Sequence, residues 1–575
     1  MSTSTQSTAA RHRSLLTASG HRVVVGIDFG ASHSGFAYAH VSDPGRIECL
    51  YEWEDQPVPY CKNYSALWYN IDEKKSEGWG YTAVRKEMDH IRDGPSAYRL
   101  LTLLKFFIEP TAAEHATVTL PHGVDALEVV ADYLSQLYKV LLERLQRNFG
   151  ESLQGEDLHF CLTVPAIWSE QAKQTMRQVA VKAGLISPAE INMPRLTLVL
   201  EPEAAAIFCC KRFSEAQLRS GDTFMVVDAG GGTVDIVAEK WTSGINNQRL
   251  TELARGDGDW CGSTFVDSRF LEWLGNKVGQ TALSQLKEEK GRDFMQVLTS
   301  WESTKRQFKG EESFRDKQYI PFSIPGSLYN LMSDESMQKL QNEQDGVDDD
   351  VYITLDDMKS FFDPIVDKTL DLIQTQLDRC PGNRCNKLFV VGGFSASPYL
   401  TRRIQERFSG SFDNLVFPRE PGAAVVQGAV LHGLNPDSIQ GRCSRFTYGL
   451  LLSRPESGFM IGKTQRSNQR DIFLHTEENR QYVEYFQPAI VANQVVQTSV
   501  TVSVYATAAA YKSETSFSDV AGRFDVGFLA VDDVPLTGDR SITVHFYFGL
   551  TELTVIARVN GTGVEKRIAV NFATR

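Results

Sequence analysis

Two similar stretches of the chain combine residue types that suit a phosphate group and a metal ion. They are VVVGIDFGASHS at 23–34 and FMVVDAGGGTVD at 224–235, and each opens with an apolar run of strand type. Each run leads to an aspartate, Asp28 or Asp228, and the chain then turns on glycine. Such a turn exposes backbone N–H groups to phosphate oxygens, and the aspartate suits a hydrated Mg²⁺. Most single glycine turns bind nothing, but two copies predict duplicated halves that face each other across one nucleotide cleft.

The composition is that of a globular protein with more than one core. At 575 residues, with 42% apolar and 23% charged residues, the chain is expected to form about two to four domains. No apolar stretch reaches the roughly 18–20 residues of a membrane span. The net charge of −13 argues against a general nucleic-acid or anionic-membrane surface. The nine cysteines are scattered without zinc-knuckle spacing, so we predict a cytoplasmic protein, with the nucleus as the alternative.

The segments around the two turns alternate between strand and helix patterns. Apolar residues recur at steps of three and four over Val124–Phe149, which predicts an amphipathic helix. Apolar runs at Phe160–Val164, Leu196–Leu200 and Lys387–Val391 predict buried strands. A capping-box pattern at Thr354 predicts the start of another helix. This alternation is typical of the α/β class.

The pattern changes near residue 435, where helix signals fade and strict alternation begins. Val500, Val502 and Val504 share one face, and the run Ile542–Phe548 alternates in the same way. Short alternating strands with Gly and Asp turns predict an antiparallel β-sandwich, and no helical region follows it. The predicted domains are a disordered tail over 1–20, two lobes over 21–223 and 224–434, and an all-β sandwich without a helical lid over 435–575.

Seven segments in a fixed order resemble the heat shock protein 70 kDa family, within the actin/hexokinase-like ATPase superfamily. They span about residues 22–433 and read GIDFGASHS, TVPAIW, LEPEAAA, VVDAGGGTVD, WESTKR, VVGGFSASP and EPGAAVVQGA. LEPEAAA and the TYG at Thr447–Gly449 look most like the diverged branch typified by the family's "member 12" proteins. The resemblance implies a duplicated, bilobal actin-like (ribonuclease H-like) ATPase domain, followed by a substrate-binding-like β-sandwich.

The resemblance also implies roles for individual residues towards ATP or ADP and Mg²⁺. Asp28 and Asp228 would orient the metal through its waters. Glu201 would hydrogen-bond a metal-bound water, Asp235 would help to position the metal or the attacking water, and Lys105 is the candidate lysine that fixes this water. The backbone amides that would hold the phosphates belong to Gly30, Ala31, Ser32, Gly230, Gly231, Gly232 and Thr233. The residues that would contact the adenosine are Glu302, Lys305, Arg306, Gly392 and Gly393.

Each of these assignments has a plainer alternative. The two aspartates could be ordinary turn residues, and Lys105 could be a surface lysine. Glu201 could be only a helix N-terminal acid, while Lys305 and Arg306 could be solvated helix charges.

Some positions depart from the family pattern. Ala31 and Ser32 stand where the family has paired threonines, so slower hydrolysis or altered switching is expected. Ala396 replaces the usual arginine after the adenosine Gly-Gly, which removes a stacking partner for adenine. The hydrophobic interdomain linker is not recognisable over 435–446. We therefore predict a weak ATPase that hydrolyses ATP to ADP and phosphate.

Two functions of different classes fit this sequence. The first is an ATP-dependent, chaperone-like protein whose β-sandwich binds unfolded or extended polypeptide. The second is a nucleotide-regulated interaction or scaffold module with little or no ATPase activity, which binds a specific protein partner. A small-molecule kinase is disfavoured because the chain has no sugar-kinase motif. Neither nucleic acid nor a membrane is expected as a partner.

Overall fold

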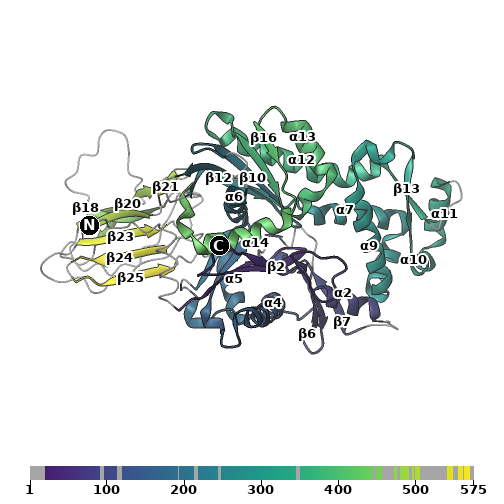
Figure 1. Cartoon of the computed structure of the whole chain (residues 1–575), viewed down its shortest axis with the longest axis horizontal. Coiled ribbons are helices and arrows are strands. Elements are labelled where there is room, and N and C mark those ends of the chain that lie inside the picture. The colour runs from purple at the N-terminus through teal and green to yellow at the C-terminus, as the bar shows by residue number, and fades with distance from the viewer. Residues whose placement is uncertain are drawn as a thin grey trace. The chain divides into compact units, whose positions relative to one another are not determined.

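The structure is a computed structural model of the chain (Figure 1). It forms two compact units, one that ends at Ile439 and one that begins at Gln440. The described residues are 20–569 except 91–95, 110, 113–118, 192, 194, 213–217, 244–247, 345–349, 444–447, 456–471, 476–479, 491–494, 498, 506–540, 548–553 and 561. The predicted disordered tail therefore lies outside the described residues, apart from Gly20.

The first sheet of the first unit is built around the turn that contains Asp28. Strand β1 pairs with β2 in antiparallel and with β8 in parallel orientation, and β9 extends the parallel side. Every residue of β1 and β8 is buried, because helices cover both faces of the sheet. The main strands in spatial order are β3 (Glu48–Cys49), β2 (His33–His40), β1 (Val23–Asp28), β8 (Leu158–Val164) and β9 (Leu196–Leu200).

The second sheet repeats this arrangement around the turn that contains Asp228. Strand β10 pairs with β11 in antiparallel and with β15 in parallel orientation, as β1 does with β2 and β8. The corresponding strands in spatial order are β12 (Gln248–Asp259), β11 (Val234–Ser243), β10 (Thr223–Ala229), β15 (Lys387–Val391) and β16 (Asn414–Val416). The predicted α/β class is confirmed, and the shared strand order is consistent with an actin-like ATPase fold.

Two helices lie between the sheets, and two pairs of helices cover the outer faces. Helices α6 (Glu201–Arg212) and α14 (Ala424–Leu434) share one apolar core with residues of both sheets (Figure 1). They cross closely, since a Cβ at Gly428 would lie 1.8 Å from the carbonyl oxygen of Ala204. The outer helices are α4 (Ala126–Phe149) and α5 (Glu170–Lys182) on the first sheet, and α7 (Ser263–Val278) and α12 (Leu355–Arg379) on the second.

The sequence patterns located several of these elements well. Strands β9 and β15 have the predicted bounds, and α4 begins two residues after the predicted start. Helix α12 is capped at Thr354, whose hydroxyl oxygen accepts the N–H of Asp357, as the capping-box pattern predicted. Among the described residues, no helix is both long and apolar enough to cross a membrane.

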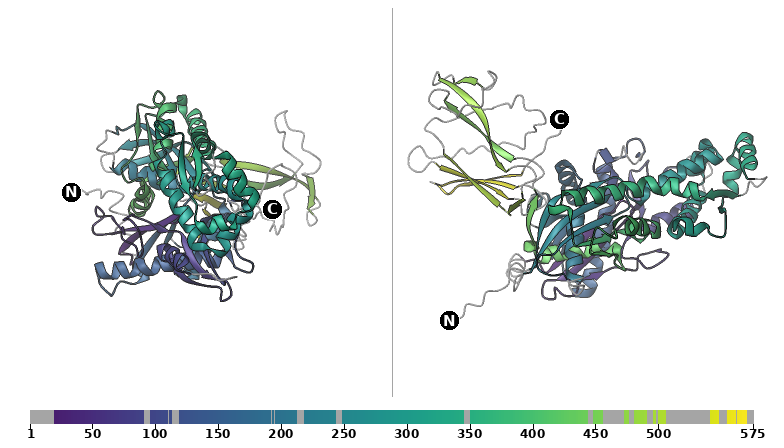
Figure 2. Two further views of the ribbon diagram at one scale, coloured as in Figure 1. Left: turned by 90° about the vertical axis from the view of Figure 1, so that its right-hand side faces the viewer. Right: turned by 90° about the horizontal axis from the view of Figure 1, so that it is seen from above.

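Each half carries an insertion outside its main sheet. The first carries a small sheet and helix α2 (Gly80–Asp89), and the second carries helix α9 (Gly291–Gln307) within the teal region that extends away from the sheets in Figure 2. The two insertions meet, because the Arg292 side chain donates to the carbonyl oxygen of Met88. The strands of the small sheet in spatial order are β6 (Lys75–Trp79), β5 (Ala66–Asn70) and β7 (Tyr98–Thr102).

The second unit consists of antiparallel strands, and none of its described residues is helical. The register places Val502 opposite Val544, and Val544 opposite Ala557, so the predicted alternating sets align across neighbouring strands. The four-stranded sheet contains β22 (Ser499–Tyr505), β23 (Ser541–Tyr547), β24 (Thr554–Val559) and β25 (Glu565–Ala569). The other strands are β18 (Tyr448–Pro455), β19 (Ile472–His475), β20 (Arg480–Ile490) and β21 (Val495–Gln497), and β17 (Ile439–Cys443) begins at the last residue of the first unit. Their packing as a sandwich stays a prediction.

Candidate active site

The fold brings the two glycine turns into contact. A Cβ at Gly231 would lie 2.5 Å from the hydroxyl oxygen of Ser32, and one at Gly232 would lie 2.9 Å from the Cβ of Ala31. Glycine is therefore required in the second turn by the close approach of the first. The backbone segments predicted to hold phosphates come from different halves of the chain, and the structure places them side by side.

Four acidic side chains gather beside these turns. Asp28 ends β1, Asp228 and Asp235 lie directly opposite each other on β10 and β11, and Glu201 begins α6 immediately after β9. All four are at most 6% exposed. Burial raises the pKa of Asp228 to about 7, and the negative charge of Asp28 adds to this effect. Four buried carboxyl groups this close disfavour one another's ionised forms, and a cationic ligand would relieve that repulsion.

Lys105 is a buried member of this cluster and not a surface lysine. It lies in the short helix η1 (Leu104–Phe107), and its ammonium donates to Glu201 Oε1 at 2.5 Å. The same ammonium lies 5.7 Å from the centre of the Trp168 ring. Burial and the neighbouring carboxylates raise the pKa of Glu201, whereas the Lys105 charge opposes this rise. Lys105 and Glu201, which the resemblance assigns to the attacking water and to a metal-bound water, are therefore paired and enclosed.

Asp235 connects the second half to the first. The backbone N–H of Ala166, just after β8, donates to Asp235 Oδ1 at 2.7 Å. Its other oxygen, Oδ2, is buried and has no hydrogen-bond partner among the described residues. Burial also raises the pKa of this carboxyl. An oxygen that is buried without a partner is costly, and a bound water or ion would satisfy it.

Lys62 belongs to the site although no sequence pattern pointed to it. Its ammonium lies 2.6 Å from Asp28 Oδ2, while the Thr163 hydroxyl lies 3.4 Å from Asp28 Oδ1. Lys62 comes from a segment before β4 (Asn63–Tyr64) that has no clear hydrophobic period. Only the folded structure shows that this lysine reaches the first aspartate.

An aromatic cluster adjoins the first turn and was also missed. The His33 ring lies 5.7 Å from the Tyr60 ring and 5.2 Å from the Tyr64 ring. Its two nitrogens lie 3.2 Å from the Ser32 hydroxyl and 3.1 Å from the Tyr81 hydroxyl. Burial lowers the pKa of His33 to about 4, and the positive charge of Lys62 contributes. The first turn therefore carries a neutral histidine at pH values well above 4.

The three predicted adenosine-binding residues of α9 form one charged group. Glu302 is 2.6 Å from both Lys305 and Arg306, and Lys305 also lies 2.7 Å from Asp267. The two cations hold the pKa of Glu302 at about 2, although burial opposes them. The Lys305 side chain is 11% exposed, whereas that of Arg306 is 70% exposed. Arg306 is therefore the member that a ligand can reach most readily.

Gly392 and Gly393 lie beside the second turn. Gly392 has φ +87°, and a Cβ there would lie 2.3 Å from the Ala229 carbonyl oxygen and 2.4 Å from Asp228 Oδ1. A side chain is excluded at this position by both conformation and space. The Tyr60 hydroxyl lies 3.9 Å from the position of a Cβ on Gly393. The first half of the chain thus approaches the predicted adenosine loop.

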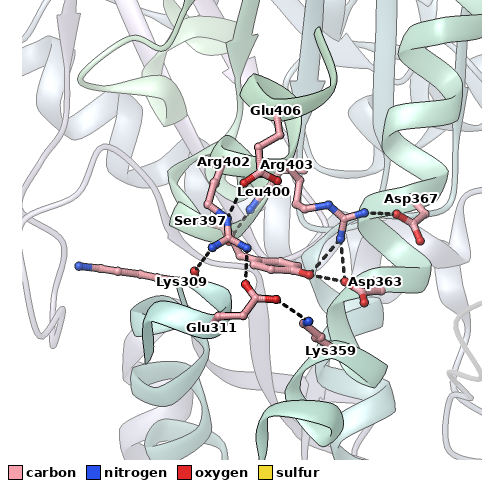
Figure 3. A network of polar contacts seen from close by, with 11 residues as sticks. Lys309, Glu311, Lys359, Asp363, Asp367, Ser397, Leu400, Arg402, Arg403 and Glu406 are labelled. Carbon is pink, nitrogen blue, oxygen red and sulfur yellow. Dashed lines mark hydrogen bonds and ion pairs between the residues drawn. The ribbon is translucent and has the colours of Figure 1, made fainter. Parts of the chain in front are cut away.

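A network of ion pairs fixes the helix that follows this loop (Figure 3). Helix α13 (Pro398–Phe408) presents Arg402 to Glu311 at 3.0 Å and Arg403 to Asp363 at 2.9 Å. Glu311 also pairs with Lys359 of α12 at 2.5 Å. These contacts link α13, which follows the predicted adenosine loop, to Glu311 and to helix α12.

The described carboxylates form no direct metal-binding set. Within the described part of the chain, no three histidine, cysteine or acidic groups are placed to bind a metal ion together. The predicted role of Asp28 and Asp228, which is to orient Mg²⁺ through its waters, needs no such direct set. The buried, partnerless Asp235 Oδ2 gives a further acceptor for metal-bound water.

The chain is similar in sequence to known proteins along most of its length. A family model described as a domain of unknown function (DUF8340) matches residues 217–417. Heat shock 70 kDa protein 12A of Homo sapiens is 26% identical over 96% of this chain and 91% of its own length. Heat shock 70 kDa protein 12B of Homo sapiens is 25% identical over the same shares.

A bacterial relative matches a shorter part of the chain. The chaperone protein HscA homolog of Herminiimonas arsenicoxydans is 30% identical over 49% of this chain and 43% of its own length. The long matches to the two human proteins cover 96% of the chain, so they extend beyond the seven motifs into the second unit. The chain resembles the heat shock protein 70 kDa family and, within it, the member 12 branch.

Proposed function

We propose that the chain is an ATP-binding, ATP-hydrolysing chaperone-like protein whose first unit is a duplicated actin-like ATPase. Its lobes would be residues 21–223 and 224–434. One observation carries the proposal: two glycine turns from equivalent strands of two sheets meet at a single buried cluster of carboxylates. The relatives named as heat shock 70 kDa proteins and chaperone proteins support the same conclusion.

The triphosphate would lie between the two turns. Backbone amides of 30–32 and 230–233 would donate to its oxygens, because glycine leaves these amides uncovered. Asp28 and Asp228 would hold Mg²⁺ through its waters, and the metal would neutralise the charge of the triphosphate. The surplus of carboxylates over lysines in the cluster and the partnerless Asp235 Oδ2 fit such a cation.

Hydrolysis would depend on positioning by Lys105 and Glu201. The Lys105 ammonium can donate to an attacking water, while Glu201 holds the ammonium in place at 2.5 Å. The enclosed setting strengthens both interactions, because little water competes there. Ala31 offers no hydroxyl to the γ-phosphate, so turnover is expected to be slow.

The adenosine would lie between α9 and the loop at Gly392 and Gly393. Exposed Arg306 offers a flat guanidinium to the base, and Glu302 offers a carboxylate to the ribose hydroxyls. Ala396 leaves the opposite face of the base without the usual arginine.

The second unit would bind extended polypeptide through its antiparallel strands. Its described strands and the chaperone names of the relatives support this role. The alternative, a nucleotide-regulated interaction module with little ATPase activity, is favoured by the Lys62–Asp28 pair and by Ala31, since both would slow a metal-dependent reaction.

Binding and single-turnover hydrolysis of ATP test the proposal. Full-length protein in excess over radiolabelled Mg·ATP should bind the nucleotide and release phosphate in a single slow phase. D28N should weaken binding or turnover, whereas D413N should change neither, because Asp413 pairs with Arg384 on the surface, away from the turns. Absence of ATP binding by the wild-type protein would refute the proposal, and binding without phosphate release would favour the interaction module.

Peptide binding tests the second unit separately. Fluorescence anisotropy of an extended, labelled peptide should show weaker binding with ATP than with ADP. Equal affinities in the two nucleotide states would show that the nucleotide does not control the strands.

A further inference from the structure

The ion pair between Lys62 and Asp28 is the feature of the site that the proposed roles leave unexplained. The two charged atoms are 2.6 Å apart, and the side chains are 12% and 4% exposed. A buried pair of this kind contributes little net stability, because desolvation offsets the attraction between the charges. In a binding site, such a pair can serve a ligand, because a charged group of the ligand can replace one of the two partners.

The backbone next to Lys62 is tightly packed, so a change of partner by Lys62 would have to come from its side chain. A Cβ on Gly35 of β2 would lie 2.5 Å from the carbonyl oxygen of Cys61 and 3.1 Å from Lys62 Cγ. The segment is therefore packed tightly against β2, and β2 follows directly from the first turn. From this fixed base, the flexible four-carbon stem carries the ammonium into the carboxylate cluster.

The charges in the cluster identify what Lys62 could bind. Four buried carboxylates are matched there by two lysines, and Lys105 already pairs with Glu201. A magnesium ion on Asp28 would repel the Lys62 ammonium, while a triphosphate would supply new acceptor oxygens within the same enclosed space. Lysine is a common phosphate-binding side chain because its ammonium acts as a point charge.

We propose that Lys62 is a phosphate-binding lysine, which rests on Asp28 in the free protein and transfers to the triphosphate of bound Mg·ATP. This inference rests on the proposed function. It assigns Lys62 a role different from that of Lys105: Lys62 binds the phosphates, and Lys105 positions the water.

Affinities of K62Q for a set of adenine ligands test this role. Glutamine keeps a hydrogen-bond donor beside Asp28 but removes the charge, so the fold should survive. Titration calorimetry with Mg²⁺ should show ATP binding weakened by at least about tenfold, the size of one charge-assisted hydrogen bond. Adenosine lacks phosphates, so its affinity should change by less than about twofold.

A matched control removes another buried lysine of the same half. The Lys173 side chain is 3% exposed and pairs with Glu170 at 2.5 Å on α5, which covers the outer face of the first sheet. K173Q should therefore leave the ATP affinity unchanged. Thermal melting of both variants reports whether the fold is intact, and K62M provides a second uncharged variant if K62Q unfolds.

The outcomes separate this inference from the proposed function. Loss of ATP affinity with unchanged adenosine affinity supports a phosphate contact by Lys62. Equal loss for both ligands, or ATP affinity within twofold of wild type, overturns the inference while nucleotide binding by the wild type stands. A wild-type protein that binds no ATP overturns both.

Discussion

The two glycine turns share a backbone plan but differ in charge. Each follows the central strand of a sheet with the same strand order, and each has its aspartate at the equivalent place. Asp28 is neutralised by Lys62 at 2.6 Å, whereas Asp228 makes no ion pair within the described residues. The two halves therefore share the strand order and the turn, while the surrounding segments provide an ion-pair partner for Asp28 and none for Asp228 among the described residues.

Disruption of the Lys105–Glu201 pair, which lies beside the two turns, should give the largest effect on activity. K105M should slow single-turnover hydrolysis of ATP by about 10²–10³-fold, because it removes a positioned donor in an enclosed site. The affinity for ATP should change less than threefold if Lys105 contacts only the attacking water. If K105M lowered the affinity for ATP as strongly as the rate, Lys105 would be a phosphate-binding residue. Its role would then not differ from the role proposed for Lys62.

The two aspartates should respond in opposite directions when each is made neutral. D28N leaves the buried Lys62 charge without its partner, so the free energy of unfolding should fall by about 3–5 kcal/mol. D228N removes a costly buried charge, so the nucleotide-free protein should gain roughly 1–3 kcal/mol. Urea unfolding of the two variants measures both changes.

The stability difference between D228N and the wild type should depend on pH, because the folded protein raises the pKa of Asp228. The folded pKa, about 7, exceeds the unfolded value, so the contribution of this group to stability is lost as pH rises through 7. The advantage of D228N should therefore be larger at pH 8 than at pH 6. Destabilisation by D228N at pH 8 would contradict the contrast between the turns.

His33 stands in the first turn where Thr233 stands in the second, and it should make stability sensitive to acid. Its folded pKa of about 4 lies below the unfolded value of 6.5, so stability is lost as pH falls between these values. The loss should reach about 3 kcal/mol by pH 4, at 1.36 kcal/mol per pH unit. The free energy of unfolding of H33Q, measured against pH, should lack this loss. If its pH dependence equalled that of the wild type, His33 would be accessible to protons in the folded protein.

The glycines at equivalent positions of the turns should differ in tolerance. A Cβ on Gly30 would lie 2.2 Å from the His33 carbonyl oxygen, whereas one on Gly230 would lie 3.2 Å from that of Thr233. G30A should therefore lower the free energy of unfolding by about 2 kcal/mol and G230A by less than about 1 kcal/mol. Similar losses would mean that the first turn can relax as readily as the second.

The sequence predicted the parts of the site that lie on regular elements. Asp28, Asp228 and Glu201 were identified because strand patterns and short motifs place them, and the structure gathers them where the sheets meet. Strands β9 and β15 were predicted to the residue because both are uninterrupted buried runs bounded by turn or helix signals.

Lys62 and the aromatic cluster could not be predicted in the same way. Their contacts join segments at 33, 60–64 and 81, and the chain between 50 and 110 has no dominant period. A lysine's reach depends on tertiary packing, here against Gly35, that no local pattern encodes. The packing of the second unit as a sandwich likewise depends on contacts between sheets, which alternation alone does not specify.

A double-mutant cycle on Mg·ATP binding tests most directly whether both aspartates serve one ligand. Calorimetric affinities of the wild type, D28N, D228N and the double variant give the coupling energy between Asp28 and Asp228. Because both would orient the same metal–triphosphate, we expect a coupling of at least about 1 kcal/mol. Wild-type protein that binds no ATP, or single effects that add to within about 0.5 kcal/mol, would contradict a shared nucleotide site.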